Sequence, residues 1–238
     1  MTRGPDKCPH LYFDSEPPVV MPAVVIIIDD IGNQLANSRA AIELPGKLNY
    51  AILPYTPYGS RLAHQAHQLG KEVLLHAPMS NISNMPLGRG ALTPALSHQQ
   101  FNDTLRASLA SIPFVRGVNN HMGSALTQRH TQMRWLMVEL ARQHLYFVDS
   151  RTDKRTVAAH IAREQYVPNL SRQIFLDNQQ NHDAIAKQFQ HLLQLARNRG
   201  MAVGIGHPYP QTIAFLEEAL PKLKRQGFRL ALVSEVIE

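Results

Sequence analysis

The sequence predicts an α/β fold, a single distorted (β/α) barrel of seven strands, or of eight. Short apolar runs alternate along the chain with longer amphipathic stretches, as happens when strands and helices alternate. The runs are apolar throughout instead of at every second position, which is typical of parallel strands covered by helices. Seven or eight such β/α units in 238 residues fit a closed or nearly closed barrel, with an open doubly wound sheet as the alternative.

Each expected strand is a short apolar run that ends in polar residues, and each expected helix is an amphipathic stretch between two runs. The strands are expected at residues 24–28, 48–53, 72–75, 116–118, 145–148, 173–176, 202–205 and 229–233, and the helices at 58–69, 97–111, 129–143, 182–199 and 211–226. Ser97 and Gln100 have the spacing of a capping box, and Gly70 and Gly200 follow helix ends, where a left-handed conformation suits glycine. Residues 77–94 are expected to form a long irregular loop, and such loops after barrel strands often carry function.

Composition narrows the class of protein. Apolar residues make up 44% of the chain and charged residues 18%, enough for a large core. The net charge of +6 is scattered without a basic run, so no nucleic-acid partner is expected. The one cysteine, Cys8, can form no intrachain disulfide, and no stretch approaches the length of a membrane span. Residues 1–22 are interpreted as a flexible proline-rich leader without the apolar region of a signal peptide, and residues 23–238 as one domain.

Polar side chains follow nearly every expected strand at the point where the strand ends. In a (β/α) barrel the carboxyl ends of the strands form one rim, and the chemistry is found there. Turns favour Asp and Asn for structural reasons, so one such residue is weak evidence, but three histidines and four aspartates on one rim indicate a site. The rim residues include Asp29, Asp30, His76, Asn119, Asn120, His121, Asp149, Ser150, Arg151, Asp177 and His207.

The stretch VVIIIDDIGN, residues 24–33, leads an apolar strand into two adjacent aspartates, which repel each other unless a cation or a proton neutralises them. Carboxylates and imidazoles form a ligand set for zinc, manganese, iron, nickel or cobalt. A cation held by one carboxylate would leave the other free to take a proton. Tyr55, after the second strand, could either stack on a sugar ring or cap the barrel, and both interpretations stay open.

Six motifs occur in order along the chain: IIIDDIG, LLHAPM, NNHMGS, VDSRT, FLDN and GIGHPYPQTI. Together they resemble the divergent polysaccharide deacetylase family, a relative of the NodB-type chitin and peptidoglycan deacetylases, over nearly all of residues 23–238. The resemblance implies a barrel of the glycoside hydrolase/deacetylase type that removes N- or O-acetyl groups from a glycan with a divalent metal. Zinc is the first expectation, with manganese, iron, nickel or cobalt as alternatives. It also implies a periplasmic or cell-envelope location, whereas a leader without a signal peptide leaves the cytoplasm open.

The resemblance also implies roles for individual rim residues. Asp29 matches the general base and Asp30 a metal ligand. His76 matches the first ligand of a His-x-x-x-His motif, but the residue four positions on is Ser80, and His121 is the natural substitute. A second group is expected to support the site or to contact substrate, and His207 is expected to act as the general acid. That supporting group comprises Asn120, Asp149, Arg151, Asp177 and Tyr55.

Two other functions compete with a deacetylase. The barrel could bind a glycan or a cell-envelope partner without catalysis, and the missing second histidine of the metal motif favours this. It could also be a glycoside hydrolase that uses two carboxylates, such as Asp29 and Asp149, at one of the two separations that such enzymes require. Fold alone decides between none of these, because barrels host many chemistries. The oligomeric state is not predicted.

Overall fold

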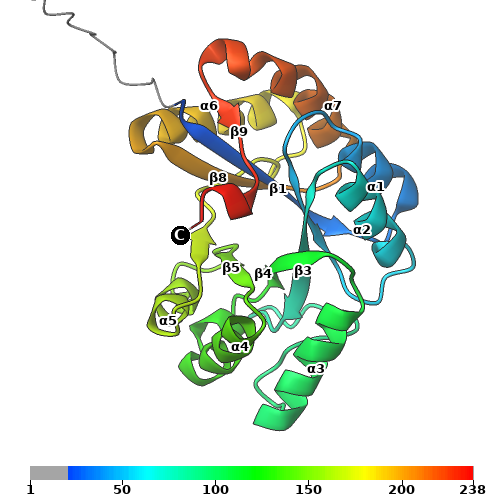
Figure 1. Cartoon of the computed structure of the whole chain (residues 1–238), viewed down its shortest axis with the longest axis vertical. Helices are drawn as coiled ribbons and strands as arrows, with labels where there is room; N and C mark the ends of the chain where they lie inside the picture. Colours follow the sequence, from blue (N-terminus) through cyan, green and yellow to red (C-terminus); the bar gives the residue numbers. More distant parts are fainter. Residues whose placement is uncertain (1–20, 238) are drawn as a thin grey trace, which may run out of the picture.

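A computed structural model describes residues 21–237, so the expected leader lies almost wholly outside the described residues. The described chain holds a nine-stranded parallel sheet with helices on its outer side (Figure 1). The strands are β1 (Ala23–Ile31), β2 (Asn49–Ile52), β3 (Glu72–Met79), β4 (Val115–Met122), β5 (Tyr146–Asp149), β6 (Asn169–Ser171), β7 (Ile174–Phe175), β8 (Met201–Gly206) and β9 (Arg229–Leu230). The α-helices are α1 (Leu35–Ile42), α2 (Gly59–Gln68), α3 (His98–Ala110), α4 (His130–Arg142), α5 (Ala158–Glu164), α6 (His182–Arg199) and α7 (Pro210–Ala219).

The sheet curls round on itself through one split strand. The strand order is β6-β5-β4-β3-β2-β1-β8-β7, with β9 added to β1, and every pair is parallel. Strands β6 and β7 are two halves of one extended segment, separated only by Arg172 and Gln173. The first half pairs with β5 and the second half with β8, so the two ends of the order meet along the same segment. The predicted class, a distorted parallel (β/α) barrel, is confirmed.

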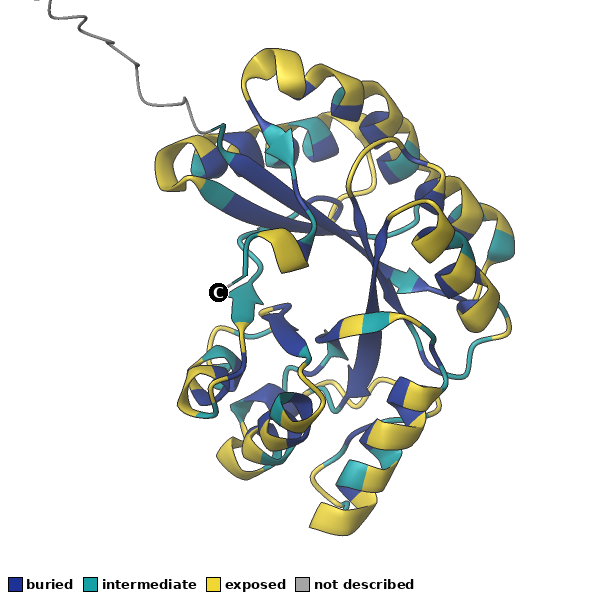
Figure 2. Cartoon of the chain, in the orientation of Figure 1, coloured by how far each residue is buried: buried dark blue, intermediate teal, exposed yellow. Residues whose placement is uncertain are grey.

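Two apolar cores follow from the alternation of side chains along each strand. On β1, Val24, Ile26 and Ile28 face the outer core between sheet and helices, whereas Val25 and Ile27 face the inner core of the barrel. The strands are therefore buried on both faces, while the outer surfaces of the helices are exposed (Figure 2). This is why the strand sequences are apolar throughout.

The amino end of the barrel is covered by the segment after β9. Val233 is fully buried in the inner core, and its backbone N–H donates to the side chain of Asn49 at 2.8 Å. The Asn49 amide donates in turn to the Ile26 carbonyl at 2.9 Å. At the same end Glu72 accepts hydrogen bonds from the Tyr146 hydroxyl and from the backbone N–H of Ser234. These buried polar groups fix the lower end and leave the carboxyl ends of the strands for a site.

Several element boundaries differ from the sequence-based expectation. Helices α1 and α5 were not expected because both are short, with eight and seven residues. The helix expected at 211–226 ends at Ala219, because Pro221 cannot continue an α-helical hydrogen-bond ladder, and 3₁₀ turns follow. Strands β3 and β4 run on to Met79 and Met122, so residues 77–79 belong to a strand and not to the loop. The capping box of Ser97 is present, and Gly70 and Gly200 have positive φ.

No helix within residues 21–237 is long and apolar enough to cross a membrane.

Candidate active site

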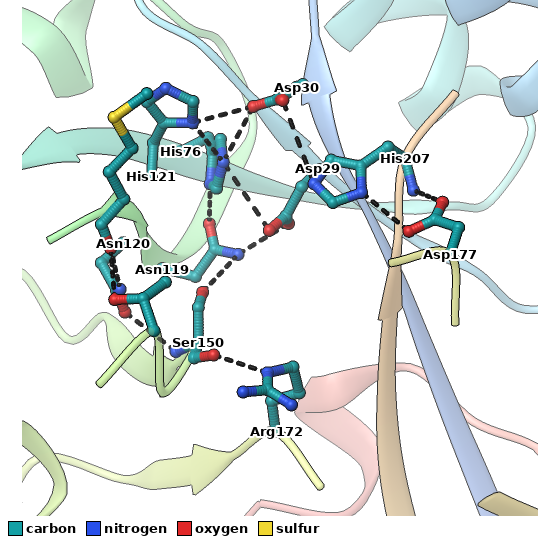
Figure 3. A network of polar contacts seen from close by, with 12 residues as sticks. Asp29, Asp30, His76, Asn119, Asn120, His121, Ser150, Arg172, Asp177 and His207 are labelled. Atoms are coloured by element: carbon teal, nitrogen blue, oxygen red, sulfur yellow. Dashed lines mark hydrogen bonds and ion pairs between the residues drawn. The ribbon is translucent and has the colours of Figure 1, made fainter. Parts of the chain in front are cut away.

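The alternation of side chains directs polar residues into the mouth of the barrel. Ile27 belongs to the inner core of β1, so Asp29, two residues on, also faces inward, at the carboxyl end. The same step of two leads from inner-core residues on β3 and β8 to His76 and His207. Asp29 and His76 are buried, and His207 is partly buried. Side chains from distant parts of the sequence therefore converge in one polar network (Figure 3).

A bulge in β1 brings the adjacent carboxylates of Asp29 and Asp30 to the same side. Ile28 and Ile31 are three residues apart, yet their partners on β2, Tyr50 and Ile52, are two apart. The extra residue adopts a left-handed conformation at Asp30, with φ of 57°. Both carboxylates thus approach His76 Nε2, at 3.6 Å for Asp29 Oδ2 and 3.2 Å for Asp30 Oδ1.

Three side chains form a compact donor set. Asp30 Oδ1 lies 2.9 Å from His121 Nδ1 and 3.2 Å from His76 Nε2, and the two ring nitrogens are 3.1 Å apart. These separations approach the ~3.3 Å expected between tetrahedral ligands about 2.0–2.1 Å from a zinc ion. Asp30 Oδ1 is buried and accepts no hydrogen bond of acceptable geometry from the described residues. An orphaned carboxylate oxygen facing two imidazole nitrogens fits a divalent cation.

Asn119 fixes which nitrogen of His76 is available. Its amide nitrogen donates to Asp29 Oδ1 at 2.8 Å, and because a carboxylate only accepts, the amide oxygen must face His76 Nδ1, at 2.7 Å. An amide oxygen also only accepts, so Nδ1 carries the proton and Nε2 presents its lone pair to the donor set. No role was expected for Asn119, whereas the neighbouring Asn120 was expected to support the site or to contact substrate. The strand alternation distinguishes the two, because Asn119 and His121 share the inner face of β4.

The two adjacent aspartates have opposite electrostatic environments. Burial raises the pKa of Asp29, and this outweighs the opposing effects of His76, His207 and the Asn119 amide. Burial also opposes the charge of Asp30, but the neighbouring imidazoles of His121 and His76 outweigh it and hold the pKa of Asp30 below its usual range. Asp30 therefore stays ionised while Asp29 has an increased affinity for a proton. A pair of carboxylates separated in this way is typical of one ligand and one base.

His207 is held by Asp177, as Figure 3 shows. His207 Nδ1 lies 2.9 Å from Asp177 Oδ1, and the His207 backbone N–H donates to Asp177 Oδ2 at 2.6 Å. The Thr212 hydroxyl donates to the same Oδ2 at 2.8 Å. Burial disfavours the charged ring, but Asp177, Asp29 and Asp30 together raise the pKa of His207 to about 9. The other ring nitrogen, Nε2, is directed towards the site, 4.0 Å from Asp30 Oδ2.

The Asp149 carboxylate is bonded within its own loop. Asp149 accepts the backbone N–H of Arg151 and the Thr156 hydroxyl, at 2.8 and 2.9 Å, so its carboxylate orders its own loop. The reason is again strand alternation, which gives the inward position after β5 to Ser150. The Ser150 hydroxyl lies 3.5 Å from the Asn119 amide, and Arg172 donates to the Ser150 carbonyl at 2.6 Å. No role was expected for Ser150, although it follows the fifth expected strand, and Arg172 was not expected at all, since serine and arginine in a loop give no distinctive signal.

Asn120 supports the mouth from the other side of β4. Its Oδ1 accepts the Ser150 backbone N–H at 2.9 Å, and its amide donates to the Met122 carbonyl at 2.7 Å. It therefore joins the ends of β4 and β5 without touching the donor set.

A cavity of about 510 Å³ opens over the donor set. Asp30, His121 and His207 lie at its floor, and Tyr209 lines it beside His207, with the two rings 5.3 Å apart. Tyr55 lines its wall with φ of 58°, while Tyr58 packs against the outer core. The loop that follows β3 contributes the residues from Pro86 to Arg89. The volume lies within the range of small-molecule binding sites, and the lining is a mixture of polar and apolar residues.

The fold and this arrangement at the carboxyl ends of the strands define a class of protein related to polysaccharide deacetylases. The family model described as divergent polysaccharide deacetylase matches residues 26–237. The chain therefore belongs to the divergent polysaccharide deacetylase family.

Two curated relatives are similar over most of the chain. The uncharacterized protein YibQ of Escherichia coli (strain K12) is 36% identical over 206 residues, which cover 87% of this chain and 65% of that protein. An uncharacterized protein of Haemophilus influenzae (strain Rd) is 38% identical over 200 residues, covering 84% of this chain and 71% of that protein. The chain thus spans about two thirds of the length of these relatives.

Solved structures share the fold. The uncharacterized protein ATU2773 from Agrobacterium tumefaciens C58 superimposes with a TM-score of 0.87 at 21% identity, over 92% of this chain and 91% of that one. The peptidoglycan N-acetylglucosamine deacetylase Bc1960 gives 0.56 at 13% identity, over 92% and 89%. The CE4 family pseudoenzyme BA3943 from Bacillus anthracis gives 0.53 at 15% identity, over 91% and 65%. The fold therefore occurs both in a deacetylase and in a protein described as a pseudoenzyme.

Proposed function

We propose that the protein is a metal-dependent hydrolase that removes acetyl groups from a polysaccharide or another cell-envelope glycan. The observation that carries this proposal is the division between the two adjacent aspartates. Asp30 lies in the donor set with His76 and His121, whereas Asp29 is bound by Asn119 and has a raised pKa. One carboxylate is thus placed to hold a cation and the other to accept a proton. Family membership supports the substrate class and a location in the cell envelope.

Asp30, His76 and His121 would hold the divalent metal. Two imidazole nitrogens and one carboxylate favour zinc, with manganese, iron, nickel and cobalt as alternatives. The bound ion would supply positive charge that polarises a carbonyl oxygen and acidifies water. His121, from the strand next to His76, takes the place of the second histidine that position 80 lacks.

The protein's own groups supply the proton transfers. Asp29 accepts the proton of the attacking water, and the Asn119 amide bonded to its other edge keeps the carboxylate oriented. His207 is protonated at neutral pH and donates its proton to the departing amine or alcohol. Asp177 holds the ring so that Nε2 faces the site. Asp149 is committed to its loop, and this weakens a glycoside hydrolase mechanism that pairs it with Asp29.

The test is acetate release from N- and O-acetylated oligosaccharides in the presence of zinc, manganese or cobalt. We expect turnover by the wild type and losses of about a hundredfold or more in Asp29→Asn and His207→Gln, because general acid–base groups contribute this much. Asp183→Asn, at an exposed position at the start of α6, is the matched control and should retain full activity.

Unchanged rates in Asp29→Asn and His207→Gln would contradict the assigned roles. A wild type that binds acetylated glycans but releases no acetate with any of these metals would support a binding protein with an inactive deacetylase site.

A further inference from the structure

We propose that Arg89 selects a carboxylate-bearing glycan for this cavity. The inference rests on the proposed function for the glycan class, and it concerns recognition rather than turnover. It starts from a cation in the cavity wall that has no anionic partner among the described residues.

Arg89 and Tyr55 form a stacked pair. The guanidinium carbon of Arg89 lies 4.4 Å from the centroid of the Tyr55 ring. Both residues line the same cavity as Asp30 and His207. Arg89 is therefore part of the wall that surrounds the candidate catalytic groups, although it lies in the loop after β3 and Tyr55 follows β2.

The loop backbone is built to bring Arg89 against the tyrosine. Gly90 has φ of +85°, and a Cβ placed there would lie 3.0 Å from Tyr55 Cε2 and 2.7 Å from Ser108 Oγ. A larger residue at this position would push the loop away from the ring. Two residues further on, the N–H of Leu92 donates to the Pro78 carbonyl at 2.8 Å and tethers the loop to β3. The loop backbone next to Arg89 is thus held by close packing at Gly90 and by the hydrogen bond to the sheet at Leu92.

The contact with Tyr55 leaves the guanidinium donors of Arg89 free. These N–H donors lie in the plane of the group, and an aromatic ring offers them no oxygen acceptor. No hydrogen bond or ion pair joins the Arg89 side chain to another residue within residues 21–237. A planar fork of donors matches the two oxygens of a carboxylate. A wall of the cavity therefore presents a ready carboxylate-binding group.

The rest of the lining fits a sugar with a single negative charge. Apart from Arg89, the ionisable acidic and basic groups of the lining are Asp30, His121 and His207, all assigned to the catalytic centre. Neutral amides and hydroxyls complete the polar lining and suit sugar hydroxyls. One arginine matches one carboxylate better than a doubly charged phosphate, and the net charge of +6 favours the approach of an acidic polymer. The lining residues with a neutral amide or hydroxyl are Asn33, Gln34, Asn37, Ser38, Tyr55, Thr56 and Tyr209.

The experiment compares two oligosaccharides of equal length by calorimetry. One is a hyaluronan tetrasaccharide, in which N-acetylglucosamine alternates with glucuronate, and the other is chitotetraose, which has acetylated sugars but no carboxylate. We expect the wild type to bind the hyaluronan fragment at least about tenfold more tightly at low salt, from a charge-assisted hydrogen-bonded pair. Arg89→Gln should abolish this preference by lowering the affinity for the hyaluronan fragment about tenfold more than the affinity for chitotetraose. Arg199→Gln, an exposed position at the end of α6 that removes the same charge, should keep it.

Three results would overturn the inference: equal affinities of the wild type for the two oligosaccharides, no measurable binding of the hyaluronan fragment, or an equal loss of preference in Arg199→Gln. The outcome is separable from that of the proposed function. A preference that depends on Arg89 in a protein that releases no acetate would support the inference and refute the hydrolase. Acetate release without such a preference would do the reverse.

Discussion

Asn119 is the residue on which the organisation of the site depends. Its side chain joins His76, from the metal-ligand set, to Asp29, the proposed base, and each contact determines the other. If the amide were turned by half a rotation, its oxygen would face the Asp29 carboxylate, and both of these groups only accept hydrogen bonds. The orientation of the imidazole and that of the carboxylate are therefore coupled. Residues that form a hydrogen bond with a metal ligand set the orientation and the basicity of that ligand.

Asn119→Ala should therefore weaken metal binding by about 10–100-fold, as removal of a ligand's hydrogen-bond partner does in other metal sites. The measurement is zinc affinity in competition with a chelator of known affinity. Asn120→Ala is the matched control, since Asn120 is equally buried on the same strand but bonds only to backbone groups. Equal affinities in Asn119→Ala and the wild type would show that the contact does not orient His76.

At the level of the elements, the sequence predicts what apolar patterning and end signals encode. The strands and the longer helices were predicted because uninterrupted apolar runs and capping residues mark them. The carboxyl-terminal part of β4 was not, because Asn119, Asn120 and His121 are polar residues within a strand. Polar residues at the end of a strand have the sequence pattern of a loop. Only the three-dimensional structure shows that they continue the strand into the mouth of the barrel.

The positions of residues within the site could also be predicted only in part. Strand ends locate the rim, and the structure brings Asp29, Asp30, His76, His121 and His207 together there, as expected. Which of two neighbours faces inward depends on register, and the sequence does not give register without the sheet. This is why a supporting role was expected for Asp149, whereas Ser150 has the inward position. The bulge at Asp30 also shifts the strand register, and nothing in the sequence DDIG indicates it.

An ion pair away from the site joins helices α3 and α4. Because one partner is a carboxylate, its contribution to the stability of the fold is expected to depend on pH. Glu139 of α4 is buried and accepts two hydrogen bonds from Arg106 of α3, at 2.9 and 2.8 Å. This pairing holds the pKa of Glu139 below its ordinary value of 4.5. A carboxylate with a lowered folded-state pKa stabilises the fold above the unfolded-state pKa and loses this effect as pH falls through the folded-state pKa.

Glu139→Gln should therefore lower the free energy of unfolding by about 1–2 kcal/mol at neutral pH, allowing for the half-exposed arginine. The difference from the wild type should shrink as pH falls below the ordinary value of 4.5, since the wild-type carboxyl is then protonated as well. Urea unfolding at neutral pH and at about pH 3 measures both values. Glu164→Gln, an exposed helix position, is the control and should change stability little at either pH. A deficit independent of pH would contradict the assignment to charge.

The two ends of the barrel differ in role: the amino end contributes to stability, and the carboxyl end holds the candidate catalytic groups. The amino end is sealed by the buried segment around Val233 and by Asn49, whereas the carboxyl end gathers ionisable groups around a cavity. Such a division is general for (β/α) barrels and lets the mouth keep two adjacent carboxylates, one buried and one partly exposed, that the lower core could not tolerate. The central claim is that a cation neutralises that pair.

The most direct test of this claim is the metal content of purified protein, with wild type beside Asp30→Ala and His121→Ala. Mass spectrometry for zinc, manganese, iron, nickel and cobalt after dialysis gives the stoichiometry. We predict about one transition-metal ion per wild-type chain and a loss of most of it in both variants, because three protein ligands are the usual minimum for a catalytic site. A wild type that holds no metal and takes up none from solution would contradict the account.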